Sequence, residues 1–207
     1  MRRYFAMCGG ILIMGLGVAL SKLSLMGNDP TSAMVMAING HVGVDFSILM
    51  IAANSLMFLL ELCFGRNLVG AGTFVNWLGV GPLTTLYSGW ITAHWDIPQE
   101  VVPRLLLMAA GVLLLSLSAS LYQTAGLGVS PYDSLSIMLT ARFSIPYFWC
   151  RIFTDSICTA VTFVLGGILG PGTLISALGL GPFISFFDRY ISHKVCGVQK
   201  GQTQARG

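Results

Sequence analysis

The chain repeats itself at an interval of about 100 residues. Gly27-x-x-Pro30 recurs as Gly128-x-x-Pro131. Residues 70–82 are identical to residues 170–182 at seven of the thirteen aligned positions. Chance would give about one identity over such a stretch. Membrane transporters of several folds are built from two structural repeats, with the functional surface where the repeats meet. The duplication therefore predicts a pseudo-symmetric molecule made of two similar halves.

The composition is typical of a membrane protein. Hydrophobic residues make up 55% of the chain and charged residues only 9%, and the mean hydropathy is +0.78. Soluble domains carry about 25% charged residues, so a water-soluble chain of this length could not bury so much apolar surface. The net charge of +3 lies mainly at the termini, which argues against nucleic acid as a partner. We expect an all-α polytopic membrane protein in contact with the lipid bilayer.

Each half contains three long apolar segments and one short segment. The long segments are near the roughly 20 residues that a helix needs to cross a hydrocarbon core of about 30 Å. They cover residues 4–26, 46–64, 73–92, 105–125, 147–166 and 173–192. The sequence thus predicts the following organisation: a membrane repeat over 1–95, a connecting loop over 96–104, a second repeat over 105–192 and a cytoplasmic tail over 193–207.

The short segment follows the first long segment of each half. It begins with Asp29-Pro30 or Ser130-Pro131, which are typical N-cap and first-turn residues of a helix. It is expected to end at Asn39-Gly40 or near Phe143-Ser144. Ten to thirteen helical residues span only about 15–20 Å, which is half a membrane.

Two topologies fit these segments. If the short segment crosses the membrane, each half has four spans and the repeats are parallel. If the short segment is a re-entrant half-helix, each half has three spans and the repeats are inverted, which the shortness of the segment favours. Both topologies place both termini on the cytoplasmic side of a bacterial inner membrane. The Gly-x-Gly-Pro sequences at 79–82 and 179–182 also predict an interruption in the last long helix of each half.

The starts of the two short helices are the first candidate binding site. Free N–H groups and the helix dipole attract anions, and broken transporter helices direct such ends toward substrates. Asp29, Pro30, Ser130 and Pro131 would form this site, for a small-molecule or anionic substrate. Alternatively, both motifs are simply tight turns between two helices. Asp29 would itself fill one of the two anion positions, whereas Ser130 would leave the other free.

Ionisable residues within the apolar segments are the second group of candidates, because a charge inside a membrane is costly. Asp155 lies deep in segment 147–166 with Arg151 one turn before it, and the equivalent residue of the first half is the neutral Asn54. Arg151 and Asp155 either form a structural ion pair, or Asp155 couples function to protons. Asp133 lies in the first turn of the second short helix, where a negative charge is favoured whatever its function.

The remaining polar residues indicate no catalytic or metal centre. Asn76 could line a cavity, Thr73 could cap a helix, and Glu61 is expected to snorkel to the membrane interface from its segment end. The aromatic residues, Tyr122 and Tyr147 among them, lie mostly near segment ends, as in interfacial belts. The histidines do not cluster, and no hydrolase, P-loop or dinucleotide-binding motif occurs. We expect neither an enzyme nor a bound metal or cofactor.

Two stretches resemble those of a known family. Residues 126–135 (Gly-Leu-Gly-Val-Ser-Pro-Tyr-Asp-Ser-Leu) and residues 70–82 (with Gly-x-Gly-Thr-x-x-Asn) resemble the signature stretches of the YczE/YitT group of bacterial membrane proteins. Members commonly show Gly-x-x-Pro-Trp-Asp-x-Leu. Here Tyr132 replaces the Trp, and Thr31-Ser32 replace the Trp-Asp pair in the first half. The resemblance covers most of residues 8–192, and some members are loosely linked to small-molecule export or secondary-metabolite production.

Two functional hypotheses follow. The first is a small-molecule transporter or exporter with its site between the two repeats. The second is a non-transporting membrane partner that supports an enzyme or a biosynthetic pathway. Small residues four apart, such as Ser116 and Ser120, permit close packing within one chain or between chains, so the oligomeric state stays open.

Overall fold

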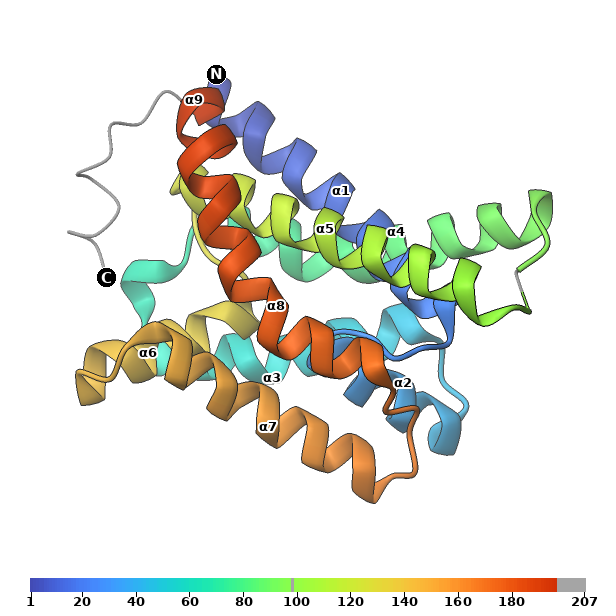
Figure 1. The fold of residues 1–207 in the computed structure, drawn as a ribbon. Helices are drawn as coiled ribbons and strands as arrows, with labels where there is room; N and C mark the ends of the chain where they lie inside the picture. The colour runs from blue at the N-terminus through green and yellow to red at the C-terminus, as the bar shows by residue number, and fades with distance from the viewer. Residues whose placement is uncertain (98, 197–207) are drawn as a thin grey trace.

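The structure, a computed structural model, describes residues 1–97 and 99–196, and it contains no β-strand in this part of the chain. Its elements, drawn in Figure 1, are α1 (Arg2–Ser24), α2 (Pro30–Val42), α3 (Phe46–Phe64), η1 (Arg66–Leu68), α4 (Ala71–His94), α5 (Val101–Ala125), α6 (Pro131–Phe143), α7 (Tyr147–Val164), α8 (Pro171–Phe187), η2 (Asp188–Ser192) and α9 (His193–Cys196). The expected all-α fold is confirmed.

The two short helices form as their first residues predict. Pro30 and Pro131 occupy the first helical turn, where a proline loses no hydrogen bond. Each helix has 13 residues and is therefore about 20 Å long. The expected end of α2 at Asn39-Gly40 is wrong, because the helix continues to Val42 and ends where Gly43 adopts a left-handed conformation.

The predicted interruption of the last long helices is also wrong. Both α4 and α8 are continuous, with Pro82 and Pro182 inside them. A proline removes one backbone donor, and a long helix can tolerate that loss. The neighbouring Gly81 allows close helix packing instead, since a Cβ at this position would lie 3.1 Å from the backbone oxygen of Ser47 on α3.

Helices α1 and α5 form a closely packed antiparallel pair. A Cβ on Gly10 would lie 3.1 Å from the Ser118 oxygen, and a Cβ on Gly111 would lie 3.0 Å from the Gly17 oxygen. These two contacts are reciprocal, because Gly111 and Ser118 lie 101 residues after Gly10 and Gly17. Each N-terminal part therefore packs against the C-terminal part of the other helix, as small residues permit in membranes.

The loops before the short helices cross to the opposite half. The Gly172 N–H donates to the Met26 oxygen at 2.9 Å, and the Gly72 N–H donates to the Leu127 oxygen at 2.8 Å. Gly27 and Gly128 have φ values of 112° and 118°, which favour glycine. Each Gly-x-x-Pro turn of one half therefore docks on the Gly-x-Gly-Thr start of α8 or α4 in the other half.

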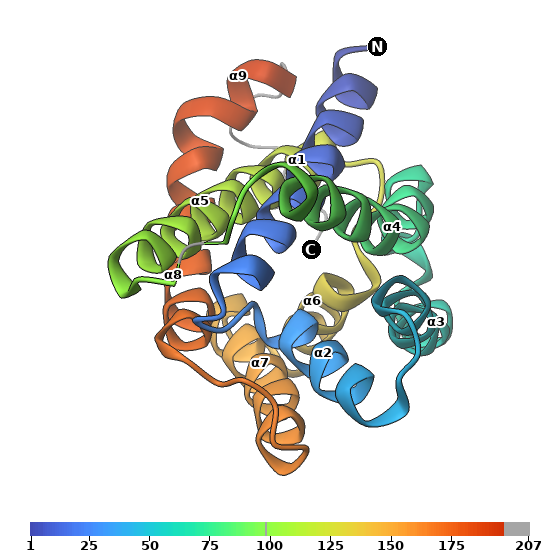
Figure 2. The same ribbon diagram turned by 90° about the vertical axis from the view of Figure 1, so that its right-hand side faces the viewer.

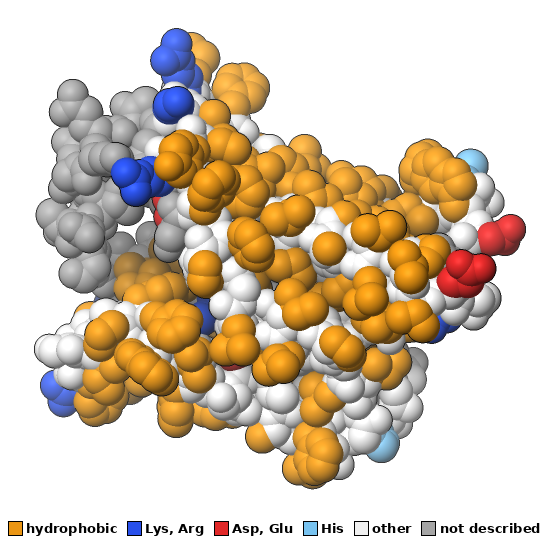
Figure 3. All heavy atoms as spheres, in the orientation of Figure 1, with side chains coloured by type: hydrophobic (Ala, Val, Ile, Leu, Met, Phe, Trp, Pro, Cys, Tyr) orange, Lys and Arg blue, Asp and Glu red, His pale blue; other side chains and the backbone are white. Residues whose placement is uncertain are grey.

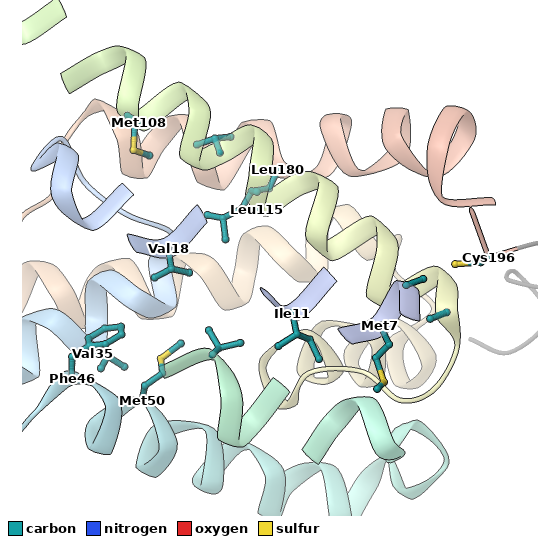
Figure 4. Close-up of a cluster of buried hydrophobic side chains, with 14 residues drawn as sticks. Met7, Ile11, Val18, Val35, Phe46, Met50, Met108, Leu115, Leu180 and Cys196 are labelled. Carbon is teal, nitrogen blue, oxygen red and sulfur yellow. The ribbon is translucent and has the colours of Figure 1, made fainter. Parts of the chain in front are cut away.

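The helices are arranged in two layers. Figures 1 and 2 show α1, α4 and α5 together on one side, and α2, α3, α6 and α7 on the other. The buried hydrophobic cluster in Figure 4 surrounds α1, with Val18 near Leu115 on α5. This apolar core holds the first layer together and also faces the second layer.

The outer surface is largely apolar. Within the described part of the chain, four helices are long and apolar enough to cross a membrane: α1, α3, α5 and the helix over Pro171–Ser192. Figure 3 shows hydrophobic side chains across the middle of one face, with Lys and Arg gathered near the N-terminus and Asp and Glu beside the α4–α5 connection at the other end. Such a belt between two charged ends is typical of a protein embedded in a bilayer.

The expected tail begins as helix. Helix α9 continues η2 as far as Cys196, which is buried with its thiol 3.9 Å from the Leu121 oxygen of α5. The rest of the expected tail, residues 197–207, lies outside the described residues, as does residue 98 of the expected connecting loop. That loop ends earlier than predicted, since α5 begins at Val101 rather than 105.

Candidate functional site

A small cavity of about 70 Å³ lies between the two layers, at the starts of the short helices. Six of the nine residues proposed from the sequence line it: Asp29, Asn54, Asn76, Ser130, Asp133 and Arg151. We call this space the central cavity. Pro30 and Pro131 are buried as the first residues of α2 and α6, and Asp155 lies beside the cavity as a partner of Arg151. The fold therefore brings all nine residues together.

The two layers give the central cavity two different walls. The layer of α1, α4 and α5, together with α8, which packs against α5, supplies apolar residues with Asn76 as the exception: Met14, Val18, Val80, Leu115, Ala119, Leu180 and Ile184. The Asn76 amide is turned to this wall, with its nitrogen 3.3 Å from the Met14 sulfur. The opposite wall, from α2, α3, α6 and α7, is mostly polar. A mostly apolar pocket with a few convergent polar groups is the usual form of a small-molecule site.

Arg151 holds the polar wall together. Its guanidinium forms an ion pair with Asp133 of α6, and its Nε lies 3.3 Å from Asp155 Oδ1 one turn further along α7. The Arg151–Asp155 pair expected from the sequence is thus present, with Asp133 as a second carboxylate partner. The Arg151–Asp133 pair links α7 to α6, and removal of one member would leave an uncompensated buried charge.

Tyr132 is a site residue that the sequence did not reveal. Its ring lies 4.6 Å from the Arg151 guanidinium carbon, and its hydroxyl donates to Asp155 Oδ1. The signal for it was the replacement of a signature Trp by Tyr. Tyr147 also contacts the cluster, since its oxygen accepts from Arg151 at 3.5 Å. Tyr147 thus contributes to this cluster from the first turn of α7.

The prediction that Tyr122 belongs to an interfacial belt is wrong, because its side chain is completely buried. Its hydroxyl oxygen lies 3.4 Å from Ser130 Oγ and accepts a hydrogen bond from Gln123 at 3.3 Å. The same Gln123 amide donates to Asp133 Oδ2 at 3.3 Å. These hydrogen bonds tie the end of α5 to the start of α6, a contact that proximity to a segment end did not reveal.

Both short helices have capped N-termini. Asp29 Oδ2 accepts from the Ser32 N–H at 3.1 Å, and Ser130 Oγ accepts from the Asp133 N–H at 3.1 Å. The expectation that Ser130 leaves an anion position free is therefore wrong. The site also contains three carboxyl groups, of Asp29, Asp133 and Asp155, and one guanidinium. This excess of acid favours a cation or a hydrogen-bonding solute over an anion.

The first-half part of the polar wall contains buried polar atoms without partners. Asp29 Oδ1, Thr31 Oγ1 and Ser32 Oγ are all inaccessible, and none has a hydrogen-bond partner among the described residues. Most buried polar groups in proteins are hydrogen-bonded to protein or water. Three such atoms beside one cavity therefore indicate a position for water or for a polar ligand.

A larger cavity of about 370 Å³ lies at the end of the molecule remote from the N-terminus. We call it the outer cavity. It lies between the end of α1, helix α2 and the α7–α8 connection, with Lys22, Asn28 and His41 among its lining residues. Asn28 lines the outer cavity and Asp29 lines the central cavity, so the two cavities come close to each other at the loop over residues 27–29.

Glu61 does not snorkel to the interface as expected. Its exposed fraction is 0%, and both carboxylate oxygens are buried without a hydrogen-bond partner among the described residues. Thr73, by contrast, has a local structural role, because its hydroxyl accepts from the Gly70 N–H at 3.1 Å. Within residues 1–97 and 99–196, no group of three His, Cys, Asp or Glu side chains is placed to hold a metal ion.

The apolar surface, the helices long enough to cross a bilayer and the relatives of the chain together define an integral membrane protein. Residues 1–189 match DUF6198, a family of unknown function, and the chain belongs to this family. It is similar to the uncharacterised membrane protein YczE of Bacillus subtilis, with 24% identity over 88% of the chain and 82% of the relative. The expected resemblance to YczE is thereby confirmed.

Two other relatives are also uncharacterised. A protein of Haemophilus influenzae is 27% identical over 87% of this chain and 80% of its own length. The YyaS protein of Bacillus subtilis is 19% identical over 86% of this chain and 88% of its own length. No solved structure matches the chain.

Proposed function

We propose that this protein is a small-molecule transporter of a bacterial inner membrane, with its substrate site at the central cavity and without enzymatic activity. The observation that carries the proposal is the polar wall around Arg151, with unpartnered buried polar atoms of α2 opposite an apolar wall. Ionisable residues at membrane depth are costly and usually line a transport path.

The two halves form inverted repeats in this proposal. The reciprocal, antiparallel contacts of α1 and α5 support it, because a two-fold axis that relates antiparallel spanning helices lies in the membrane plane. The short helices α2 and α6 then start near the middle and run in opposite directions, as Figure 1 draws them. Both termini lie on the cytoplasmic side, and the outer cavity opens to the other side.

The small size of the central cavity implies that substrate movement needs a conformational change. Drug-sized ligands occupy pockets of about 300–1,000 Å³, whereas the central cavity measures about 70 Å³. The outer cavity, at about 370 Å³, is large enough for a small molecule. A substrate would pass between the two when the loop at residues 27–29 moves relative to α8.

The substrate class follows from the charges. Three carboxyl groups and one guanidinium favour an organic cation or a zwitterion with an amine. The purified protein in proteoliposomes should give transient currents on a solid-supported membrane when such solutes are added. A panel of amines, amino acids and carboxylates is the probe. The Asp155→Asn variant should lose the current while it is still expressed and folded, although with a lower melting temperature because its contacts with Arg151 and Tyr132 are weakened.

The same assay addresses the rival function, a non-transporting membrane partner. A partner that only supports an enzyme would show no solute current in the wild type, and Asp155→Asn would leave its supporting role nearly intact. Wild-type flux with a normally active Asp155→Asn variant would remove Asp155 from the mechanism.

The orientation of the repeats has its own test. Single cysteines at positions 66 and 104, in a cysteine-free background, can be probed in intact cells with an impermeant thiol reagent. Inverted repeats place Arg66 with the termini and Arg104 outside, so labelling is expected at 104 and not at 66. Labelling at 66 and not at 104 would make the repeats parallel.

A further inference from the structure

Glu61 is a buried acid in the last turn of α3. It belongs to α3, one of the helices long and apolar enough to cross a membrane, and its side chain is completely buried. Neither carboxylate oxygen has a hydrogen-bond partner within the described residues. Unlike Asp133 and Asp155, it has no ion pair with Arg151. It is also absent from the lining of the central cavity.

Among the described residues, no Lys, Arg or His forms an ion pair with Glu61. Helix α3 packs against α2, α4, α6 and η1. The groups on these elements that act on the carboxyl are Ser134 and Asp133 of α6, and Asp133 carries the same sign of charge. None of the other titratable groups of these four elements forms a hydrogen bond or an ion pair with Glu61: His41, Tyr87, His94, Tyr132, Arg142 and Arg66, the last of which is exposed.

These surroundings suit a neutral carboxylic acid. An ionised carboxylate without a partner is very unfavourable in a low-dielectric interior, whereas a protonated carboxyl needs only an acceptor for its hydrogen. Ser134 forms no hydrogen bond with Glu61 in this structure, but its hydroxyl donates to the Pro131 oxygen at 2.8 Å, which leaves the Ser134 oxygen available as an acceptor. Hard metal ions need about six oxygen ligands, and the site does not provide them.

The second half shows that this position does not require an acid for packing. The equivalent of Glu61 is Thr162, 101 residues later, which is also completely buried. Its hydroxyl donates to the Cys158 oxygen of its own helix at 2.8 Å and is thereby satisfied. A neutral residue with an internal hydrogen bond fills the same place in the fold, so the acid in the first half calls for another explanation.

We propose that Glu61 is a proton-binding site that couples this protein to the proton gradient. The inference rests on the proposed transport function. The carboxylate takes a proton from water when α3 and α6 separate, and it returns that proton to water on the opposite side after the rearrangement. Because Glu61 acts on Asp133, its protonation also changes the electrostatic potential at the central cavity.

Infrared spectroscopy of the protein in lipid bilayers tests the proton site without a known substrate. A protonated carboxylic acid gives a carbonyl band that disappears on ionisation. We expect the wild type to show such a band, to lose it as the pH is raised from about 5 to 9, and the Glu61→Gln variant to lack it at every pH. The matched control is Asp155→Asn, which should retain the band, because Asp155 is paired with Arg151.

A second variant keeps the test decisive if Glu61→Gln folds poorly. Glu61→Asp keeps the acid one methylene shorter, so its band should persist at a shifted frequency. A wild type without a band from Glu61, or with a Glu61 band that does not change over this pH range, would overturn the proposal. A titrating Glu61 in a protein that gives no solute current would instead retain the proton site and reject the transport function.

Discussion

The two halves of the molecule share their backbone features but differ in the side chains around the central cavity. Gly27 and Gly128 make equivalent turns and docking contacts. In contrast, the second half carries Arg151, Asp155, Asp133 and Tyr132 at positions 101 residues after the first-half residues Met50, Asn54, Ser32 and Thr31. The repeat therefore preserves the scaffold, while the ionic residues of the cavity are concentrated in the second half.

The largest effect is expected from Arg151→Met, which gives α7 the residue that α3 has at the equivalent position. Asp133 and Asp155 would lose their buried partner, and the loss of one member of such a pair costs about 3–5 kcal/mol. Chemical unfolding of the detergent-solubilised protein measures this difference.

A triple variant tests whether the unpaired carboxylates cause this loss of stability. Adding Asp133→Ser and Asp155→Asn to Arg151→Met gives all three positions their first-half residues and removes the unpaired charges. We expect the triple variant to recover much of the lost stability. If Arg151→Met alone is as stable as the wild type, the ion pairs do not hold α6 against α7.

The next largest loss of stability is expected from substitutions in the two Gly-x-x-Pro turns. Gly27→Ala and Gly128→Ala should each lower the free energy of unfolding by about 2–3 kcal/mol, because both need a left-handed conformation and approach another backbone. A Cβ at Gly27 would lie 2.7 Å from the Thr173 N, and one at Gly128 would lie 2.7 Å from the Gly70 N. Thermal unfolding of both variants should give similar losses.

The control for these variants is Gly40→Ala. Gly40 lies inside α2, and nothing lies within 4 Å of its Cβ position, so alanine should raise stability by about 0.5–1 kcal/mol. A large loss in only one of Gly27→Ala and Gly128→Ala would show that the two crossed loops are not equivalent.

The smallest expected effect on stability is the difference between removing the Tyr132 hydroxyl and removing the Thr31 hydroxyl, which lie at equivalent positions of the two halves. Tyr132→Phe removes a hydrogen bond to the Asp155 carboxylate and should cost about 1.5 kcal/mol. Thr31→Val removes a hydroxyl that has no partner among the described residues, so stability should remain the same or rise slightly. Paired melting curves test this, and an equal loss in both variants would mean that Thr31 is also hydrogen-bonded in solution.

Much of the fold was predictable because membrane helices are defined by length and apolar composition. The segment 46–64 corresponds to α3, and the Asp-Pro and Ser-Pro sequences marked the starts of α2 and α6. The Gly-x-Gly-Pro sequences were misinterpreted, since glycine can break a helix or permit close packing. Only the presence of α3 beside Gly81 decides between these outcomes.

The candidate site was predictable in its residues but not in its contacts. Depth within an apolar segment singled out Arg151 and Asp155, whereas the ion pair between Arg151 and Asp133 joins two helices and has no local sequence signal. The burial of Glu61 was missed for a related reason. When all faces of a helix are apolar, the sequence does not indicate which face meets protein and which meets lipid.

The crossed docking of the loops has a consequence for how the chain is made. Met26 and Gly27 emerge early in synthesis, but the backbone that they contact begins at Gly170 and is made near the end. The turn at Met26 and Gly27 therefore lacks its backbone contacts in the membrane until most of the second half has been inserted. Leu127 and Gly128, in contrast, meet residues 70–73 that already exist when they are synthesised.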